Sequence, residues 1–401
     1  MVRMPASFVR RAYIFLCIVT VLHFILSISF PSYGRVTSES ISRLAGDKWF
    51  DPFEGSYVAT DYDCSAPARL EPSRKANATI LFLARNSDLQ GVVTSLKQME
   101  DRFNKRFRYP YTFLNDKPFS DKFKQTIVDL TDAPVEFGLI PPEDWNQPGW
   151  IDENKAAANR KEMQEKEIVY AAYRASSRLL VPIMARDIFS YRNMCRFNSG
   201  FFYRHSLMQK YRYYWRVEPD VIFYCDLGYD PFLYMQDNEK VYGFNIVLPD
   251  YIETIASLWN VTKQFIAEYP EVAARNNSMD FISDDGGETY NLCHFWSNFE
   301  IADADFWRSE AYSKYFTTLD AYGGFYYERW GDAPVHSIAA SLFLPRDKLH
   351  FFNDIGYRHH PLEHCPIGEL HKQGKCWCKE EENFDYHWYS CMPKFERMLQ
   401  S

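Results

Sequence analysis

The stretch YYWRVEPDVIFYCDL, from Tyr213 to Leu227, decides the expected fold. Its first half is rich in aromatic and β-branched residues, which are typical of a buried strand. Glu218-Pro219-Asp220 follows, and because proline cannot donate a hydrogen bond to a sheet, it predicts the end of the strand and a turn. The two carboxylates are therefore expected at the end of a strand, where open α/β sheets bind their ligands.

Strands and helices are predicted to alternate upstream of this stretch. Residues 78–85, ATILFLAR, form a short apolar run typical of a buried strand, and residues 86–99 carry helix caps followed by helical periodicity. Residues 111–114 predict the next strand. Because strand, helix and strand begin a βαβ unit, we expect an α/β fold with a mostly parallel sheet. One domain is predicted over residues 76–401, with a loop-rich, cysteine-bearing part after Phe351.

The N-terminal sequence predicts attachment to a membrane. Residues 12–30 form a largely apolar run that is long enough to span a bilayer core. Arginines within residues 1–11 favour a cytoplasmic tail, which makes the run a signal anchor and places the rest of the chain in a lumen. Residues 31–75 lack periodicity and are expected to form a stem. The alternative is a cleaved signal peptide, but the run is long for one and lacks an A-x-A-like cleavage site.

Composition and cysteine content narrow the class of protein. Aromatic residues make up 17% of the chain, which suits stacking on sugars, and a net charge of −8 argues against a nucleic-acid binder. Eight of the nine cysteines follow the predicted anchor, and an even number in an oxidising compartment predicts that they pair in disulfides. Cys376 and Cys378 have a spacing that could suggest a metal site, but because no second pair has zinc-site spacing, disulfides are the prediction.

The carboxylates of the Glu-Pro-Asp turn suggest a cation site. Glu218 and Asp220 would offer hard oxygen ligands suited to Mg²⁺ or Mn²⁺ carrying a substrate diphosphate. The structural alternative is that Asp220 caps the turn while Glu218 pairs with Arg216. Residues 190–202, SYRNMCRFNSGFF, add arginines, amides and aromatic rings, which a nucleoside diphosphate requires. The structural alternative for residues 190–202 is a helix N-terminus that carries an ordinary surface arginine.

Two other segments offer polar groups that a site could use. Glu300 lies in SNFEI, residues 297–301, where burying a carboxylate would be costly unless it faced a polar site. The segment GYRHHP, residues 356–361, offers an imidazole that could complete a metal shell with Glu218. A lone histidine is more often structural, so this assignment depends on its surroundings.

Residues 323–336, GGFYYERWGDAPVH, form the last charged cluster. Their two glycines are expected to let the backbone pass close to a ligand. Glu328, Arg329 and Asp332 supply charge beside them.

In this order, the segments resemble the fungal Golgi α-1,2-mannosyltransferases, which are the glycolipid 2-α-mannosyltransferases. The resemblance covers nearly the whole chain from about residue 76, and its motifs are PEDWNQPGWID, SYRNMCRFNSGFF, YWRVEPDV, SDDGG, YNLCHFWSNFEIAD, GGFYYERWGDAPVHSIAASLFLP and the cysteine-rich tail. It implies a GT-A-like glycosyltransferase domain behind a transmembrane helix and a stem. It also implies a single-pass type II protein of the Golgi membrane with a luminal catalytic domain.

The resemblance implies a reaction and its catalytic residues. Such enzymes move mannose from GDP-mannose to a mannose hydroxyl of a glycoprotein or oligosaccharide, depend on Mn²⁺ and retain the anomeric configuration. Glu300 matches the carboxylate proposed as nucleophile, and Asp332 matches a second active-site position. Retention permits either a double displacement through Glu300 or same-face attack, in which Glu300 would stabilise an oxocarbenium-like charge.

The resemblance also implies the binding residues. Glu218 matches the metal-binding glutamate, and His359 matches the histidine ligand, with His360 as the alternative one position away. Tyr191 matches an active-site position and is assigned, together with Arg192, to the nucleotide-phosphate region.

Two other functions are compatible with these features. A mannosylphosphate transferase would share the scaffold and pass mannose-1-phosphate, and a membrane-anchored lectin would bind mannan without chemistry. The sequence leaves the acceptor open among O-linked, N-linked and lipid-linked chains.

Overall fold

The computed structural model of the 401-residue chain describes residues 74–166 and 181–400. The predicted cytoplasmic tail and anchor, and all but the last residues of the predicted stem, lie outside these ranges. Among the described residues, no helix combines the length and apolarity that crossing a bilayer requires.

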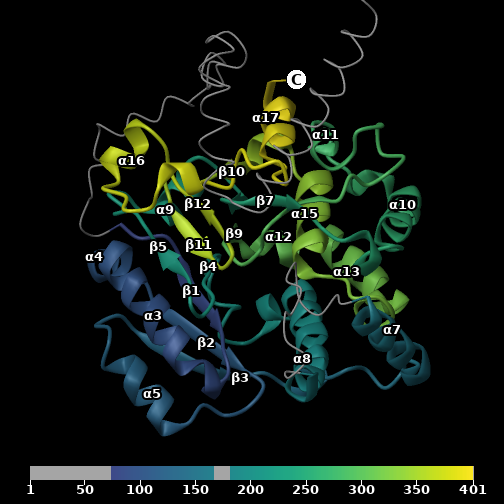
Figure 1. The fold of residues 1–401 in the computed structure, drawn as a ribbon, viewed down its shortest axis with the longest axis horizontal. Helices are drawn as coiled ribbons and strands as arrows, with labels where there is room; N and C mark the ends of the chain where they lie inside the picture. Colours follow the sequence, from purple (N-terminus) through teal and green to yellow (C-terminus); the bar gives the residue numbers. More distant parts are fainter. Residues whose placement is uncertain (1–73, 167–180, 401) are drawn as a thin grey trace, which may run out of the picture. The chain divides into compact units, whose positions relative to one another are not determined.

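A seven-stranded sheet lies at the centre of the described part of the chain (Figure 1). Its order is β10-β6-β9-β4-β1-β2-β3. Every neighbouring pair is parallel except those of β9, which is antiparallel to β4 and β6. The predicted α/β fold with a mostly parallel sheet is therefore confirmed. The strands are β1 (Ala78–Leu83), β2 (Tyr111–Asn115), β3 (Val135–Leu139), β4 (Tyr213–Arg216), β6 (Tyr242–Phe244), β9 (Glu300–Asp303) and β10 (Leu349–Phe351).

Helices cover both faces of this sheet (Figure 1). In β1, Ile80 and Phe82 pack into the core under α3 and α5, whereas Leu81 packs into the core on the other face. Because both faces are buried, the strand is apolar throughout instead of alternating. The longer helices are α3 (Leu89–Met99), α5 (Asp121–Val128), α7 (Glu153–Glu165), α8 (Val181–Gly200), α10 (Leu258–Glu268), α13 (Glu310–Tyr322), α15 (Asp332–Phe343) and α17 (Met392–Gln400).

Shorter elements connect these. The short helices are α4 (Lys105–Phe107), α6 (Pro142–Trp145), α9 (Pro231–Asp237), α11 (Met279–Ile282), α12 (Ala304–Arg308), α14 (Gly324–Tyr327) and α16 (Glu369–Gln373). Strands β7 (Val247–Pro249) and β8 (Cys293–Phe295) form an antiparallel pair. A three-stranded sheet consists of β5 (Ile222–Phe223), β11 (Tyr357–His359) and β12 (Leu362–His364), in the order β12-β11-β5. This small sheet joins the loop-rich C-terminal part to the chain that follows β4.

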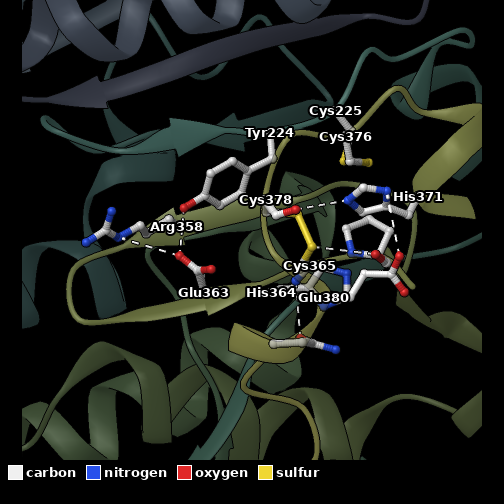
Figure 2. The surroundings of a disulfide bond; sticks show 12 residues. Tyr224, Cys225, Arg358, Glu363, His364, Cys365, His371, Cys376, Cys378 and Glu380 are labelled. Atoms are coloured by element: carbon white, nitrogen blue, oxygen red, sulfur yellow. Dashed lines mark hydrogen bonds and ion pairs between the residues drawn. A yellow bond between two sulfur atoms is a disulfide. The ribbon is translucent and has the colours of Figure 1, made fainter. Parts of the chain in front are cut away.

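The described residues contain three disulfides, Cys225–Cys376, Cys293–Cys391 and Cys365–Cys378. The first two tie the C-terminal part to the rest of the domain, and the third lies within the C-terminal part. Figure 2 shows Cys365–Cys378 beside His371, whose Nε2–H donates to the Cys378 carbonyl oxygen at 3.0 Å. Sulfurs bonded to each other are not thiolate ligands, so the prediction of disulfides rather than a metal at Cys376 and Cys378 is confirmed.

The expected pairing of all the luminal cysteines was wrong for Cys195. It is a free thiol, fully buried in α8, and burial raises its pKa. Each of the three bridges uses a cysteine from the C-terminal part, and Cys195 lies instead in the core under the central sheet. Cys64 lies outside the described residues.

Candidate active site

The Glu-Pro-Asp turn is fixed to helix α3 from two sides. The Ser95 hydroxyl donates to the Glu218 carbonyl oxygen at 2.8 Å and accepts from the Val221 N–H at 3.0 Å. The Asp220 N–H donates to the Gly91 carbonyl oxygen at 3.1 Å. The position at which β4 ends and the chain turns is therefore set by hydrogen bonds to a rigid helix.

The two carboxylates of the turn have different surroundings. Asp220 has a left-handed backbone (φ 61°), and its carboxylate lies against Gly91, where a Cβ atom would come within 2.5 Å of Oδ2. The turn therefore directs Asp220 to α3, and Glu218 is the carboxylate that faces His359. The structural alternative weighed for the motif holds in part, since Glu218 also pairs with Arg216.

His359 reaches Glu218 through the pairing of β5 with β11. Phe223 lies opposite Tyr357 in this antiparallel pair, so the chain just before β5 meets the chain at the end of β11. The His359 Nε2 atom lies 3.3 Å from Glu218 Oε2. His360 is exposed, so His359 is the histidine that the structure brings to the turn.

Arg216 links Glu218 to Asp332 in the interior. Its Nη2 atom lies 2.5 Å from Glu218 Oε1, and its Nη1 atom lies 2.5 Å from Asp332 Oδ2. Asp332 Oδ2 also accepts from the Ser297 hydroxyl at 2.8 Å. Desolvation would raise the pKa of Glu218, but the charge of Arg216 and the contact with His359 lower it to about 2, so this carboxylate is ionised at neutral pH.

Sequence reasoning assigned no functional role to Arg216, although a signal for one exists. Side chains alternate along a strand, so Tyr214, Arg216 and Glu218 point to one face of the sheet. A cation placed between a tyrosine and a carboxylate on a buried face requires partners, and this requirement predicts a polar cluster there.

Glu300 lies behind Arg216 in a buried network. The two residues are directly opposite each other in the β4–β9 pair, so their side chains share a face. The Glu300 side chain is 1% exposed; one oxygen accepts from the Tyr214 hydroxyl and the other lies 2.8 Å from His336 Nδ1. Trp307 Nε1–H in turn donates to the Tyr214 oxygen at 2.8 Å. The predicted requirement that a buried Glu300 face polar groups is therefore met.

His336 is the second residue that sequence reasoning missed. Its Nδ1 faces Glu300 and its Nε2 lies 3.1 Å from the Asn198 carbonyl oxygen, so both ring nitrogens face acceptors. The Nε2–H donates to the Asn198 carbonyl oxygen, which can only accept, while Nδ1 pairs with the Glu300 carboxyl group. The sequence does contain a signal for His336. It lies one helical turn after Asp332 on α15, so the two side chains are expected on the same face of the helix.

Tyr191 and Arg192 lie on α8 with separate surroundings. The Arg329 guanidinium lies over the Tyr191 ring, 5.4 Å from its centroid. Arg192 is 1% exposed, and its Nη2 donates to Asn159 Oδ1 at 2.8 Å and to the Glu328 carbonyl oxygen at 3.0 Å. These contacts of Arg192 join α7 and the residue after α14 to α8, and neither is made with the Arg216 cluster.

The glycines of the predicted ligand loop have structural roles. Gly323 ends α13 with a left-handed backbone (φ 81°), which glycine adopts without strain. Gly324 packs against the Trp330 ring, where a Cβ atom would come within 2.2 Å of a ring carbon. Close packing against Trp330 therefore accounts for the glycine at position 324.

Replacing Asp332 with asparagine is expected to lower the free energy of unfolding by about 2–4 kcal/mol, because buried Arg216 loses half of its counter-charge. The measurement is urea unfolding of both proteins. The control is Asp237→Asn, which breaks an ion pair with Arg74 at the surface and should cost less than about 1 kcal/mol. Equal losses in the two variants would contradict the role of Asp332 in holding Arg216.

Comparison with known proteins identifies relatives that match most of the chain. The family of glycolipid 2-alpha-mannosyltransferases matches residues 52–400. The chain is 53% identical over 322 residues to glycolipid 2-alpha-mannosyltransferase 1 of Candida albicans, which covers 80% of this chain and 71% of that protein.

Two solved structures are similar to the described fold. The mannosyltransferase Ktr4p from S. cerevisiae in complex with GDP matches with a TM-score of 0.74 and 41% identity, covering 82% of this chain and 83% of that one. Core-mannan synthase A from Aspergillus fumigatus, in its Mn/GDP form, matches with a TM-score of 0.71 and 38% identity. This match covers 84% of this chain and 89% of that one. By these matches, the chain belongs to the glycolipid 2-alpha-mannosyltransferase family.

Proposed function

We propose that the protein transfers mannose from GDP-mannose to a mannose hydroxyl, forming an α-1,2 linkage with retention of configuration. The observation that carries this proposal is the Glu218–His359 pair at the carboxyl end of β4, where α/β sheets of the GT-A-like class bind nucleotide sugars. Family membership and two related structures, one with GDP and one in an Mn/GDP form, support it.

Glu218 and His359 would hold Mn²⁺. They provide one ionised carboxylate and one imidazole at a partly exposed position, with side-chain exposures of 27% and 30%. Within the described ranges, no third histidine, cysteine or carboxylate joins them in a cluster of metal-ligand geometry. Two protein ligands leave most of a coordination shell open, which suits a cation that is shared with a diphosphate. When bound, the ion would act as a Lewis acid toward the leaving GDP.

Arg216 and Asp332 would position this pair. Arg216 holds one oxygen of Glu218, which leaves the other directed at His359. Asp332 fixes Arg216 from α15, so we propose that its contribution to catalysis acts through Arg216.

Glu300 would act on the donor sugar. Both of its oxygens are engaged, one by the Tyr214 hydroxyl and one by His336. The Glu300 side chain is only 1% exposed and lies opposite Arg216, so direct attack on the donor sugar would require it to move, whereas stabilising an oxocarbenium-like charge from its present position would not. The contacts therefore favour same-face attack with Glu300 as an electrostatic partner over double displacement.

Removing the Cys225–Cys376 disulfide is expected to weaken Mn²⁺ binding as well as stability. The bridge anchors the chain just after β5, next to the strand that carries His359, and it closes a loop with a sequence separation of 151 residues. Replacing both cysteines with alanine should lower the free energy of unfolding by about 2–5 kcal/mol. The measurements are urea unfolding and titration with MnCl₂ and GDP.

The matched control removes Cys293–Cys391, which joins β8 to the start of α17. It should lower stability by a similar amount while leaving Mn²⁺-dependent GDP affinity within about threefold. A loss of Mn²⁺ affinity in the control but not in the Cys225–Cys376 variant would contradict the assignment.

The full-length protein is expected to be a single-pass type II protein of the Golgi membrane. This proposal rests on the sequence alone, with residues 1–11 as cytoplasmic tail, 12–30 as anchor, 31–75 as stem and 76–401 as luminal catalytic domain. The predicted acceptors are mannosylated glycoproteins or oligosaccharides.

The direct test incubates the full chain with GDP-mannose, MnCl₂ and a panel of α-mannosides. Linkage analysis should find a new α-1,2-linked mannose and released GDP. A product containing phosphate would indicate a mannosylphosphate transferase, and binding of mannan without GDP release would indicate a lectin; either result would contradict the proposed function.

A further inference from the structure

The segment Glu328–Trp330, between α14 and α15, is held rigidly. The Glu328 carboxylate accepts from the Ser257 N–H at 3.1 Å and from the Trp330 Nε1–H at 2.8 Å. The Arg329 N–H donates to the Thr254 carbonyl oxygen at 3.2 Å. The backbone of Arg329 is therefore fixed without any contribution from its own side chain.

The Arg329 side chain is buried with donors that the protein does not use. The residue is 6% exposed, and its Nε and Nη1 atoms are buried without a hydrogen-bond partner. Its guanidinium packs over the face of the Tyr191 ring. No carboxylate within the described ranges forms an ion pair with it. Burying a cation without a counter-charge costs several kcal/mol, so these unused donors indicate a ligand.

A second buried guanidinium lies close to Arg329 and also lacks a carboxylate partner. Arg192 donates to an amide oxygen and to a backbone carbonyl, and both acceptors are neutral. Burial, together with the positive charges of Arg329 and Arg160, lowers the pKa of Arg192 to about 10. Arg192 and Arg329 are therefore two buried cations whose charges interact, and within the described ranges no carboxylate forms an ion pair with either.

Other buried arginines of this domain do have carboxylate partners. Arg196, on the same helix as Arg192, is 5% exposed and binds Asp320 through Nε at 2.7 Å and Nη2 at 2.9 Å. Arg216 binds Glu218 and Asp332. Among the buried arginines of the described residues, the lack of a carboxylate partner is thus confined to Arg192 and Arg329.

We infer that Arg329, with Tyr191 and Arg192, forms an anion-binding subsite that receives a phosphate group of the nucleoside diphosphate donor. An uncompensated guanidinium favours an anion over a neutral sugar, and its planar fork matches phosphate oxygens. Asp332 interacts electrostatically with Tyr191 and holds Arg216, so the subsite adjoins the Arg216 cluster that also binds Glu218. This inference rests on the proposed function and adds Arg329 to it.

The test compares Arg329→Met with Arg196→Met by calorimetric titration with GDP in MnCl₂ and by thermal unfolding without ligand. Arg329→Met should raise the Kd for GDP by at least about tenfold, because charge-assisted hydrogen bonds to phosphate are lost. Its ligand-free Tm should stay the same or rise, because an unpaired buried cation has been removed. Arg196→Met should show the reverse: a lower Tm, with the Kd for GDP within about threefold.

An unchanged GDP affinity in Arg329→Met, or a fall in its ligand-free Tm as large as that of Arg196→Met, would overturn the inference. Arg329→Lys gives a second check, since it keeps the charge and should recover part of the lost affinity. Transfer from GDP-mannose by the unmodified protein is measured in parallel. If the unmodified protein transfers no mannose, the proposed function fails; if it does and Arg329→Met binds GDP normally, the inference alone fails.

Discussion

Replacing Glu218 with alanine is expected to reduce mannosyl transfer by at least about 100-fold and to abolish the effect of Mn²⁺ on GDP affinity. Glu218 is the carboxylate that the structure brings to His359, and it is held in its ionised form beside Arg216. Without it, His359 alone would have to hold the cation. The measurements are steady-state transfer from GDP-mannose and titration with GDP at several Mn²⁺ concentrations.

The matched control is the other carboxylate of the motif. Asp220→Asn keeps a residue that tolerates the left-handed backbone, and its side chain lies against Gly91 instead of His359. Its Mn²⁺ response should be normal. If Asp220→Asn loses the Mn²⁺ response and Glu218→Ala retains it, the two carboxylates have been assigned the wrong way round.

Replacing Glu300 with glutamine is expected to lower kcat by at least about 100-fold while leaving the Kd for GDP within about threefold. The substitution removes a negative charge from beside Arg216 and directs an amide at a buried partner. If the amide NH₂ faces His336 Nδ1–H, two donors oppose each other, so we also expect the free energy of unfolding to fall by about 1–3 kcal/mol. Transfer rates, GDP titration and urea unfolding measure these effects.

The control variant, Asp230→Asn, separates an effect on catalysis from an effect on stability. Asp230 is also a buried carboxylate that accepts from a tyrosine hydroxyl, that of Tyr109 at 2.6 Å, but it caps α9. It should lose comparable stability with kcat unchanged. A Glu300→Gln enzyme with near-normal kcat would remove Glu300 from the chemistry.

The local sequence pattern predicted many of the strands and helices, because the formation of these elements depends largely on residues that are close in sequence. The strand predicted over residues 78–85 is β1, which ends two residues earlier at Leu83, and the proline after β4 marks the end of β4. Mostly parallel pairing followed from the order of strands and helices. The antiparallel insertion of β9 between β4 and β6 did not follow, because it depends on a connection of more than eighty residues, from Arg216 to Glu300, that no local pattern records.

Site residues could be predicted from the sequence where their chemistry requires particular partners. They could not be predicted where their position depends on strand pairing between distant segments. Glu218 and Glu300 stood out because carboxylates among aromatic residues require polar partners. The choice of His359 over His360 could not come from spacing, since it follows from the antiparallel pairing of β5 with β11. The unpartnered state of Arg329 was equally hidden, because a sequence shows a charge but not the lack of its counter-charge.

The central claim is that Glu218 and His359 together hold a divalent cation at the donor diphosphate. Crystals grown with MnCl₂ and GDP, measured at a wavelength where manganese scatters anomalously, test it most directly. The account predicts one strong anomalous peak bonded to a Glu218 oxygen, to His359 Nε2 and to phosphate oxygens of GDP. A peak at other residues, or bound GDP with no peak beside Glu218, would contradict it.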